Sequence, residues 1–137
     1  MDESQARRRF SEARVARMAT ADARGRPHVV PVVFALDGEA IYSVIDAKPK
    51  RSLRLRRLAN IDANPRVSLL VDQYDEDWAA LWWVRADGTA RIVGAGPDYE
   101  RAIALLRAKY SQYETWAPIG PAIVVSVDAW RGWSAAG

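Results

Sequence analysis

The chain has 137 residues, which fits one domain with a hydrophobic core, and we expect a single domain over residues 1–137. Half of the residues are hydrophobic, which excludes a disordered chain. The net charge of +3, from 20 basic and 17 acidic residues, is too small to indicate nucleic-acid binding by itself. The absence of Cys excludes disulfides, thiolate nucleophiles and cysteine metal sites.

Targeting signals and metal motifs are missing from the sequence. The N-terminal residues are charged and lack the apolar segment of a signal peptide. No apolar run reaches the ~18 residues that would span a membrane. We therefore expect a cytoplasmic protein with no membrane partner. His28 is the only His, so a His-rich metal site is excluded.

The first half of the chain predicts one helix and three strands. Residues 2–13 place apolar side chains on one side at helical spacing, and residues 15–22 read as a strand. Strands are predicted over 28–36 and 40–45, and the Asp37-Gly38 pair between them is typical of a hairpin. Pro31 lacks a backbone N–H, so it indicates a sheet edge, a bulge or a close approach to the backbone.

The second half predicts two helices and four further strands. A helix over 52–64 ends at Pro65 and carries an inner stripe of Leu55, Leu58 and either Ile61 or Asp62. A helix opens at Gly96-Pro97 and runs to about Tyr110. Strands are predicted over 66–74, 78–86, 89–94 and 122–130, with a second hairpin at residues 87–88. Hairpins join most strands, which favours a mainly β fold with an antiparallel sheet or barrel.

The stretch WAALWWV, residues 78–84, is apolar at every position. A half-exposed strand alternates, so this pattern predicts a strand that is covered on both faces. The barrel interior would cover one face. A second copy of the chain would cover the other, and a helix of the same chain is the alternative.

A basic cluster lies at the start of the helix predicted over 52–64. Six of the ten residues from 48 to 57 are Lys or Arg. Cations are unfavourable at a helix N-terminus, whereas the free N–H groups there bind phosphate or carboxylate. The arrangement therefore predicts an anion site, with Arg54 and Arg57 on one helix face. A solvated basic surface and a nucleic-acid surface are the alternatives.

Two segments of the sequence resemble a known family. The first is ATADARGRPHVVPVVFAL, and the second is AIYSVIDAKPKRSLRLRRLANIDANPRVSLLVDQYDEDWAALWWVRADGTARIV. They resemble the split-barrel flavin-binding proteins of the pyridoxamine-5'-phosphate-oxidase-like (PPOX) class, and within it the deazaflavin-dependent group that uses coenzyme F420. The resemblance implies an antiparallel split β-barrel of the FMN-binding type, which dimerises and holds two cofactors at the dimer interface.

The resemblance also implies which residues bind the cofactor. Basic residues between a strand and the next helix would hold the phosphate, the second strand would lie along the ring with Ser43 on the adjacent strand, and Trp78 would approach the ring. The cofactor-binding residues implied are His28, Pro31, Val32, Ser43, Lys48, Lys50, Arg51, Arg54, Arg57 and Trp78. No residue is assigned a catalytic role or a metal.

The implied activity is that of an oxidoreductase that passes hydride from coenzyme F420 to a small conjugated acceptor. Trp78, Trp82 and Tyr74 would line the acceptor pocket, or else pack in the barrel or the dimer. A flavin-mononucleotide-dependent (FMN) reductase or oxidase is the first alternative. A non-catalytic flavin or deazaflavin carrier and a basic nucleic-acid-binding barrel are the others.

Overall fold

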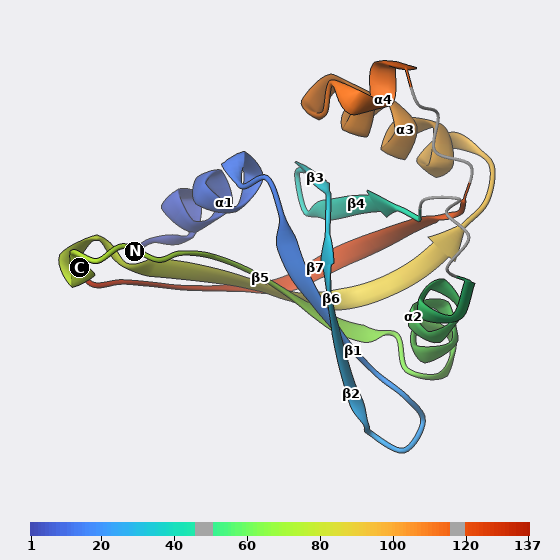
Figure 1. Ribbon diagram of the computed structural model, residues 1–137, viewed down its shortest axis with the longest axis horizontal. Coiled ribbons are helices and arrows are strands. Elements are labelled where there is room, and N and C mark those ends of the chain that lie inside the picture. Colours follow the sequence, from blue (N-terminus) through green and yellow to red (C-terminus); the bar gives the residue numbers. More distant parts are fainter. Residues whose placement is uncertain (46–50, 116–119) are drawn as a thin grey trace.

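Seven antiparallel strands form one sheet in a computed structural model that describes residues 1–45, 51–115 and 120–137 (Figure 1). The order of the strands across the sheet is β2-β1-β5-β6-β7-β4-β3. In chain order the elements are α1 (Glu3–Glu12), β1 (Ala16–Ala21), β2 (Pro27–Val32), β3 (Ala35–Asp37), β4 (Ala40–Val44), α2 (Arg51–Ala63), β5 (Arg66–Gln73), the short 3-10 helix η1 (Trp78–Ala80), β6 (Trp82–Val93), α3 (Pro97–Lys109), α4 (Gln112–Thr115) and β7 (Ala122–Ser134).

Local sequence signals set the helix starts. Asp2 caps α1 and forms a capping box with Gln5, because each side chain accepts a hydrogen bond from the other residue's backbone N–H. Gly96 precedes α3 with a φ of +94°, which favours glycine, and Pro97 occupies the first turn. The sequence predicted these helices and α2 to within one or two residues. It did not predict α4.

The two strands at the ends of the sheet order, β2 and β3, are neighbours in the chain, so the sheet curls into a split barrel. Only Val33 and Phe34 connect them. Ser43 Oγ of β4 donates a hydrogen bond of 2.9 Å to the Val33 carbonyl. The Tyr110 hydroxyl, just beyond α3, accepts one of 3.2 Å from the Phe34 N–H. These bonds fix the connection between the two edges.

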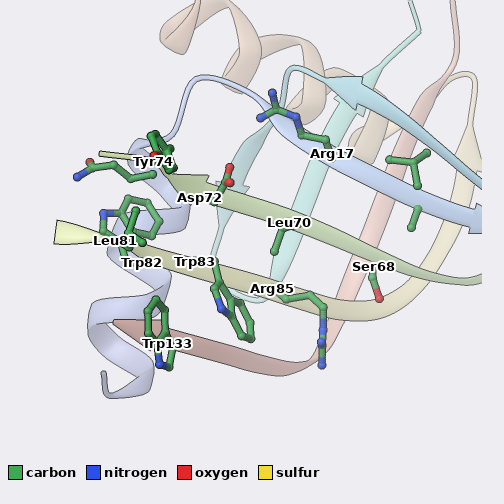
Figure 2. Close-up of a pocket in the computed structure, with 13 residues that line it drawn as sticks. Arg17, Ser68, Leu70, Asp72, Tyr74, Leu81, Trp82, Trp83, Arg85 and Trp133 are labelled. Atoms are coloured by element: carbon green, nitrogen blue, oxygen red, sulfur yellow. The ribbon is translucent and has the colours of Figure 1, made fainter. Parts of the chain in front are cut away.

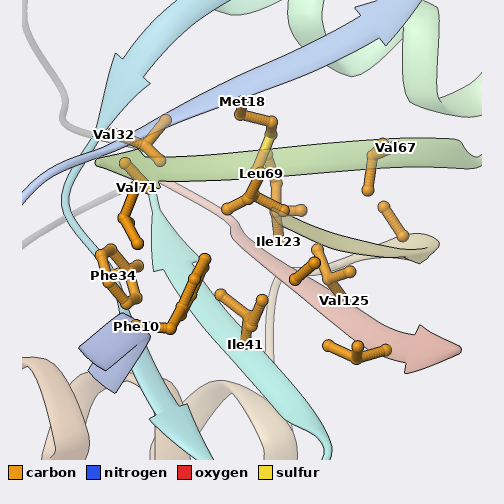
Figure 3. Packing of buried hydrophobic residues seen from close by; sticks show 14 of the residues in the cluster. Phe10, Met18, Val32, Phe34, Ile41, Val67, Leu69, Val71, Ile123 and Val125 are labelled. Atoms are coloured by element: carbon orange, nitrogen blue, oxygen red, sulfur yellow. The ribbon is translucent and has the colours of Figure 1, made fainter. Parts of the chain in front are cut away.

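The core consists of two clusters of buried side chains. The first fills the barrel interior, where Phe10 of α1 packs against Phe34 and near Met18, Leu69 and Ile123 from the strands (Figure 3). The second lies where α3 and α4 cover the outer side of β3, β4 and β7, and includes Leu106, Tyr110 and Val124. Helix α2 adds Ile61 to the interior cluster, as its apolar stripe predicts.

The prediction of a hairpin at residues 87–88 is wrong. Strand β6 runs without a turn from Trp82 to Val93, with a register shift between Asp87 and Gly88 where it pairs with β7. A Cβ atom on Gly88 would lie 2.2 Å from the Ser126 carbonyl oxygen. Glycine is therefore present because a neighbouring backbone approaches closely, and not because a turn requires it. The predicted strand over 78–86 is also wrong in its first part, because residues 78–80 form η1.

One outer face of the sheet remains open to solvent. It is formed by β1, β2, β5 and the adjoining parts of β6 and β7. Its exposed apolar side chains include Val29, Leu70 and Trp133, which are 59%, 38% and 46% exposed. Val84 of WAALWWV is buried in the core, whereas Trp83 points to the open face. No helix among the described residues is long and apolar enough to cross a membrane.

Candidate functional site

The open face of the sheet carries a cavity of about 600 Å³ (Figure 2). Its walls come from strands β1, β2, β5, β6 and β7 and from the β5–β6 connection. The lining residues are Arg17, Ala19, Val29, Ser68, Leu70, Asp72, Gln73, Tyr74, Leu81, Trp82, Trp83, Arg85 and Trp133.

The pairing of the strands explains why these side chains meet. Leu70 of β5 lies between its register partners Arg17 of β1 and Arg85 of β6. Trp83 of β6 is the register partner of Trp133 of β7. Directly opposed residues of an antiparallel pair point to the same face, so two indoles and one leucine form a continuous apolar floor. Such a floor suits a flat, apolar ligand.

The polar end of the cavity is a short hydrogen-bond network. Asp87 Oδ1 accepts hydrogen bonds from Ser68 Oγ at 2.7 Å and from Arg85 Nε at 2.9 Å. Partial burial acts to raise the pKa of Asp87, but these two hydrogen bonds and the charges of Arg85 and Arg131 outweigh it and lower the pKa. Asp87 is therefore ionised at neutral pH and holds Arg85 in place.

A second cavity, of about 520 Å³, adjoins the first. It is lined by Arg66 and Asp87, and it shares Ala19, Ser68 and Arg85 with the first cavity. Arg85 therefore lies at the boundary between an aromatic space and a polar one.

The family resemblance implies that strand β2 lies along a cofactor ring. One side of β2 faces the cavity, and the other faces the barrel interior. On the outer side, Val29 lines the cavity, and Pro31 is exposed and opposite Arg17. On the inner side, His28 is opposite Thr20, whose Oγ1 accepts a 3.0 Å hydrogen bond from Asn60 Nδ2 of α2. His28 Nδ1 is buried and has no hydrogen-bond partner among the described residues.

Helix α2 brings part of the predicted basic cluster to this region. Arg57 is partly buried and lies three residues before Asn60, so it is on the helix face that approaches β1. Arg56 is exposed. The predicted residues Lys48 and Lys50, and the side chains of Arg51 and Arg54, lie outside the described residues.

The other predicted residues lie apart from the cavity. Val32 is buried in the core. Ser43 is 2% exposed, and its hydroxyl bonds to Val33 within the fold. Trp78 is 69% exposed in η1 and does not line the cavity, although its neighbours Tyr74 and Leu81 do. The structure thus places α2 against β1, the strand that pairs with β2, while Ser43 and Val32 have structural contacts.

Sequence reasoning identified Tyr74 and Trp82 as pocket residues, and both line the cavity. It missed Arg17, Leu70, Trp83, Arg85 and Trp133. The alternation of β5, with Ser68, Leu70 and Asp72 facing away from the core, was a usable signal for one wall. Trp133 was not recognisable, because the strand predicted over 122–130 stopped short of it. No group of three or more potential metal ligands occurs in the described ranges.

The chain is similar to known proteins over nearly its full length. Residues 3–134 match the family described as pyridoxamine 5'-phosphate oxidase. A 5a,11a-dehydrotetracycline/5a,11a-dehydrooxytetracycline reductase of Streptomyces rimosus is 32% identical over 104 residues, which cover 73% of this chain and 72% of the reductase.

Solved structures share the fold. A FAD-binding protein from Mesorhizobium loti has a TM-score of 0.76 at 19% identity, covering 96% of this chain and 94% of that one. A conserved hypothetical protein from Mycobacterium tuberculosis has a TM-score of 0.75 at 22% identity, covering 98% and 86%. A heme storage protein from Vibrio cholerae has a TM-score of 0.74 at 18% identity, covering 96% and 93%. With the family match over residues 3–134, these similarities identify the chain as a split-barrel member of the pyridoxamine 5'-phosphate oxidase family.

Proposed function

We propose that this protein is an oxidoreductase that binds coenzyme F420 and reduces a small, conjugated organic acceptor. The observation that carries the proposal is the aromatic cavity on the open face, one wall of which is β2, together with the basic helix α2 that packs against the neighbouring strand β1. The family match and the reductase relative support an oxidoreductase-like function. The reductase relative is named for a polycyclic compound, which agrees with a flat aromatic cavity.

The residues present fit the proposed cofactor. His28 Nδ1 is a buried polar atom that lacks a protein partner in the described part of the chain. Arg57 lies on the face of α2 that approaches β1, and the sequence places Lys48, Lys50, Arg51 and Arg54 just before it. Coenzyme F420 carries a phosphodiester and several carboxylates, which Arg binds through paired hydrogen bonds. The family resemblance also implies Pro31, Val32, Ser43 and Trp78. Of these, Pro31 and Trp78 are exposed, whereas Val32 and Ser43 are buried and would act through the fold of the strands.

When bound, coenzyme F420 supplies hydride chemistry, and the protein contributes binding, orientation and exclusion of water. Trp83 and Trp133 offer an apolar surface against which an acceptor can lie. Val29 places β2 at one wall of the cavity, so an acceptor there would be next to the strand that is proposed to hold the ring.

We propose further that the functional form is a homodimer, in which a second copy covers the open face. Three exposed apolar side chains on that face, Val29, Leu70 and Trp133, would be removed from water by such a contact. The cavity would then be enclosed between two copies. We expect no nucleic-acid or membrane partner.

A titration tests the proposed cofactor. The purified protein is titrated with oxidised coenzyme F420 and, separately, with FMN, and the fluorescence of the cofactor is followed at moderate salt. We expect micromolar or tighter binding of F420 with preference over FMN, and loss of that binding in a Lys50/Arg57 double alanine variant. Tighter binding of FMN would change the cofactor while leaving the site; binding of neither would contradict the proposal.

An FMN-dependent reductase or oxidase is the second candidate, because the matched family is named for an oxidase. A yellow protein on purification, with flavin released on denaturation, would support it. Tight deazaflavin binding without turnover of any acceptor would instead indicate a carrier.

A further inference from the structure

The charged residues around the cavity indicate which class of acceptor it binds. Arg85 of β6 and Arg131 of β7 are register partners, so the two cations lie directly opposite each other on one face of the sheet. Like charges in such a pair destabilise a sheet. Asp87 bonds to Arg85 and is close enough to Arg131 for that charge to lower its pKa. The single negative charge of Asp87 therefore compensates only one of the two positive charges.

The other charged residues near Arg85 do not neutralise the extra positive charge. Arg66 pairs with Asp128 at 2.5 Å and with Thr89 at 3.2 Å, so those groups satisfy one another. Asp72 lies further along β5, opposite Trp83, and Arg17 lines the same cavity. Within the part of the chain that the structure describes, this end of the cavity is therefore left with surplus positive charge.

The position of Arg85 allows its guanidinium to bind an anionic ligand. Its Nε is engaged with Asp87, which Ser68 holds from the other side, so the orientation of the guanidinium is fixed. No hydrogen bond of its two terminal amino groups occurs among the described residues, and its side chain is 42% exposed. A guanidinium fixed in this way can bind a carboxylate or an enolate through two parallel N–H groups.

The apolar surface next to Arg85 indicates that the ligand is also flat and aromatic. Trp83 is two residues from Arg85 on the same strand and points to the same face, and Trp133 lies beside it (Figure 2). The cavity therefore combines a flat aromatic wall with one cationic end.

We propose that Arg85, held by Asp87 and Ser68, binds an acidic oxygen of a planar aromatic acceptor that lies against Trp83 and Trp133. Arg85 is a specificity-determining residue for acidic acceptors, and Asp87 and Ser68 are positioning residues. The assignment deepens the proposed function and rests on it for the role of the ligand as acceptor. The binding itself needs no cofactor, so the two proposals can fail separately.

Binding to the cofactor-free protein provides the test. An anthraquinone carboxylate and its methyl ester share one ring system and differ in charge, and quenching of the fluorescence of the cavity tryptophans reports their affinity. We expect the carboxylate to bind about tenfold to a hundredfold more tightly than the ester, as a charge-assisted hydrogen bond provides. Arg85→Gln should remove this preference and leave the affinity for the ester unchanged.

Two further variants separate charge from geometry. Arg85→Lys keeps the charge but loses the paired N–H groups, so it should retain part of the preference. Arg91→Gln is the matched control, because Arg91 is on the same strand but pairs with Asp98 away from the cavity. It should behave like the wild-type protein. Thermal unfolding of each variant shows whether it is folded.

Three results would overturn the assignment. The first is equal affinity of the wild-type protein for acid and ester. The second is a folded Arg85→Gln variant that keeps the preference. The third is an Arg85→Gln variant that becomes monomeric and loses both ligands, which would make Arg85 a contact between subunits. If the wild-type protein does not bind coenzyme F420 in the separate titration, the proposed function is contradicted. The role of Arg85 in binding an acidic ligand would still stand.

Discussion

Gly88 lies at a point where the backbone of β7 closely approaches β6. The Asp87-Gly88 pair is typical of a hairpin, and the local sequence carries no sign that a strand continues through it. What decides the structure is tertiary: the Ser126 carbonyl of β7 occupies the space that a side chain would need. This position could not be predicted because the competing contact comes from a residue 38 positions later in the chain.

Gly88→Ala should destabilise the protein. Its Cβ would meet backbone, which cannot move aside as a flexible side chain can, so we expect a loss of about 1–3 kcal/mol in the free energy of unfolding. Urea denaturation measures it. Gly94→Ala is the control, since nothing lies within 4 Å of a Cβ there and no loss is expected. Equal stability of the two variants would show that the strands do not approach as described.

Lys109 is a buried amine at the end of α3. Its Nζ lies 3.8 Å from the centroid of the Phe34 ring and has no hydrogen-bond partner in the ranges that the structure describes. Burial, with a smaller contribution from the charge of Arg14, lowers the pKa of Lys109 to about 8. The aromatic ring supports the cation but does not replace water.

This shift predicts that stability rises with pH. The folded state loses the Lys109 proton near pH 8, whereas the unfolded chain holds it until about 10.5, so between these values the unfolded state binds more protons. The free energy of unfolding should therefore increase from pH 8 toward pH 10; above that, the raised pKa of Tyr110 acts in the opposite direction. Chemical denaturation across this range measures the rise. In Lys109→Met the rise should disappear, and a variant that keeps it would show that other groups cause it.

At the scale of elements, the sequence predicted α2 and its inner stripe because one periodic pattern met a clear stop at Pro65. It also predicted an anion site from cations at the wrong end of the helix. The face of α2 that approaches β1 was not predictable from charge. Asn60, which sets that face by its bond to Thr20, is a buried polar residue in an otherwise basic segment.

Two adjacent arginines of α2 provide a matched comparison. Arg57→Ala should weaken coenzyme F420 binding by about 1–3 kcal/mol, because Arg57 lies on the face toward β1 and would meet the cofactor phosphate. Arg56→Ala removes the same charge from an exposed position and should have a much smaller effect. Fluorescence titration of both variants measures the difference. Equal losses would mean that the helix attracts the cofactor through its total charge alone.

At the scale of the whole molecule, the open face could not be derived from sequence. Its floor combines Leu70, Trp83 and Trp133 from three strands, and their meeting depends on strand registers that no local pattern specifies. The sequence did predict that WAALWWV would need cover beyond the barrel. In the structure, Trp83 is the residue of this stretch that needs such cover, because Trp78 lies in η1 and Val84 is buried in the core.

Leu70→Arg should dissociate the proposed dimer. It places a third cation between Arg17 and Arg85 on the open face, where a second copy would have to cover three like charges. Light scattering during size-exclusion chromatography should show a monomer for this variant and a dimer for the wild-type protein. Ala104→Arg, at an exposed position of α3 remote from that face, should remain dimeric. A wild-type monomer at working concentration would contradict the proposed assembly.

A single-turnover experiment tests most directly whether the protein is a reductase. The protein loaded with reduced coenzyme F420 is mixed rapidly with a planar conjugated enone, and the absorbance of the oxidised cofactor is followed. We expect oxidised cofactor to appear at a rate that saturates with the concentration of the enone, and the saturated analogue of the enone to give none. Tightly bound reduced cofactor that no conjugated acceptor oxidises would contradict the claim that this family member is a reductase.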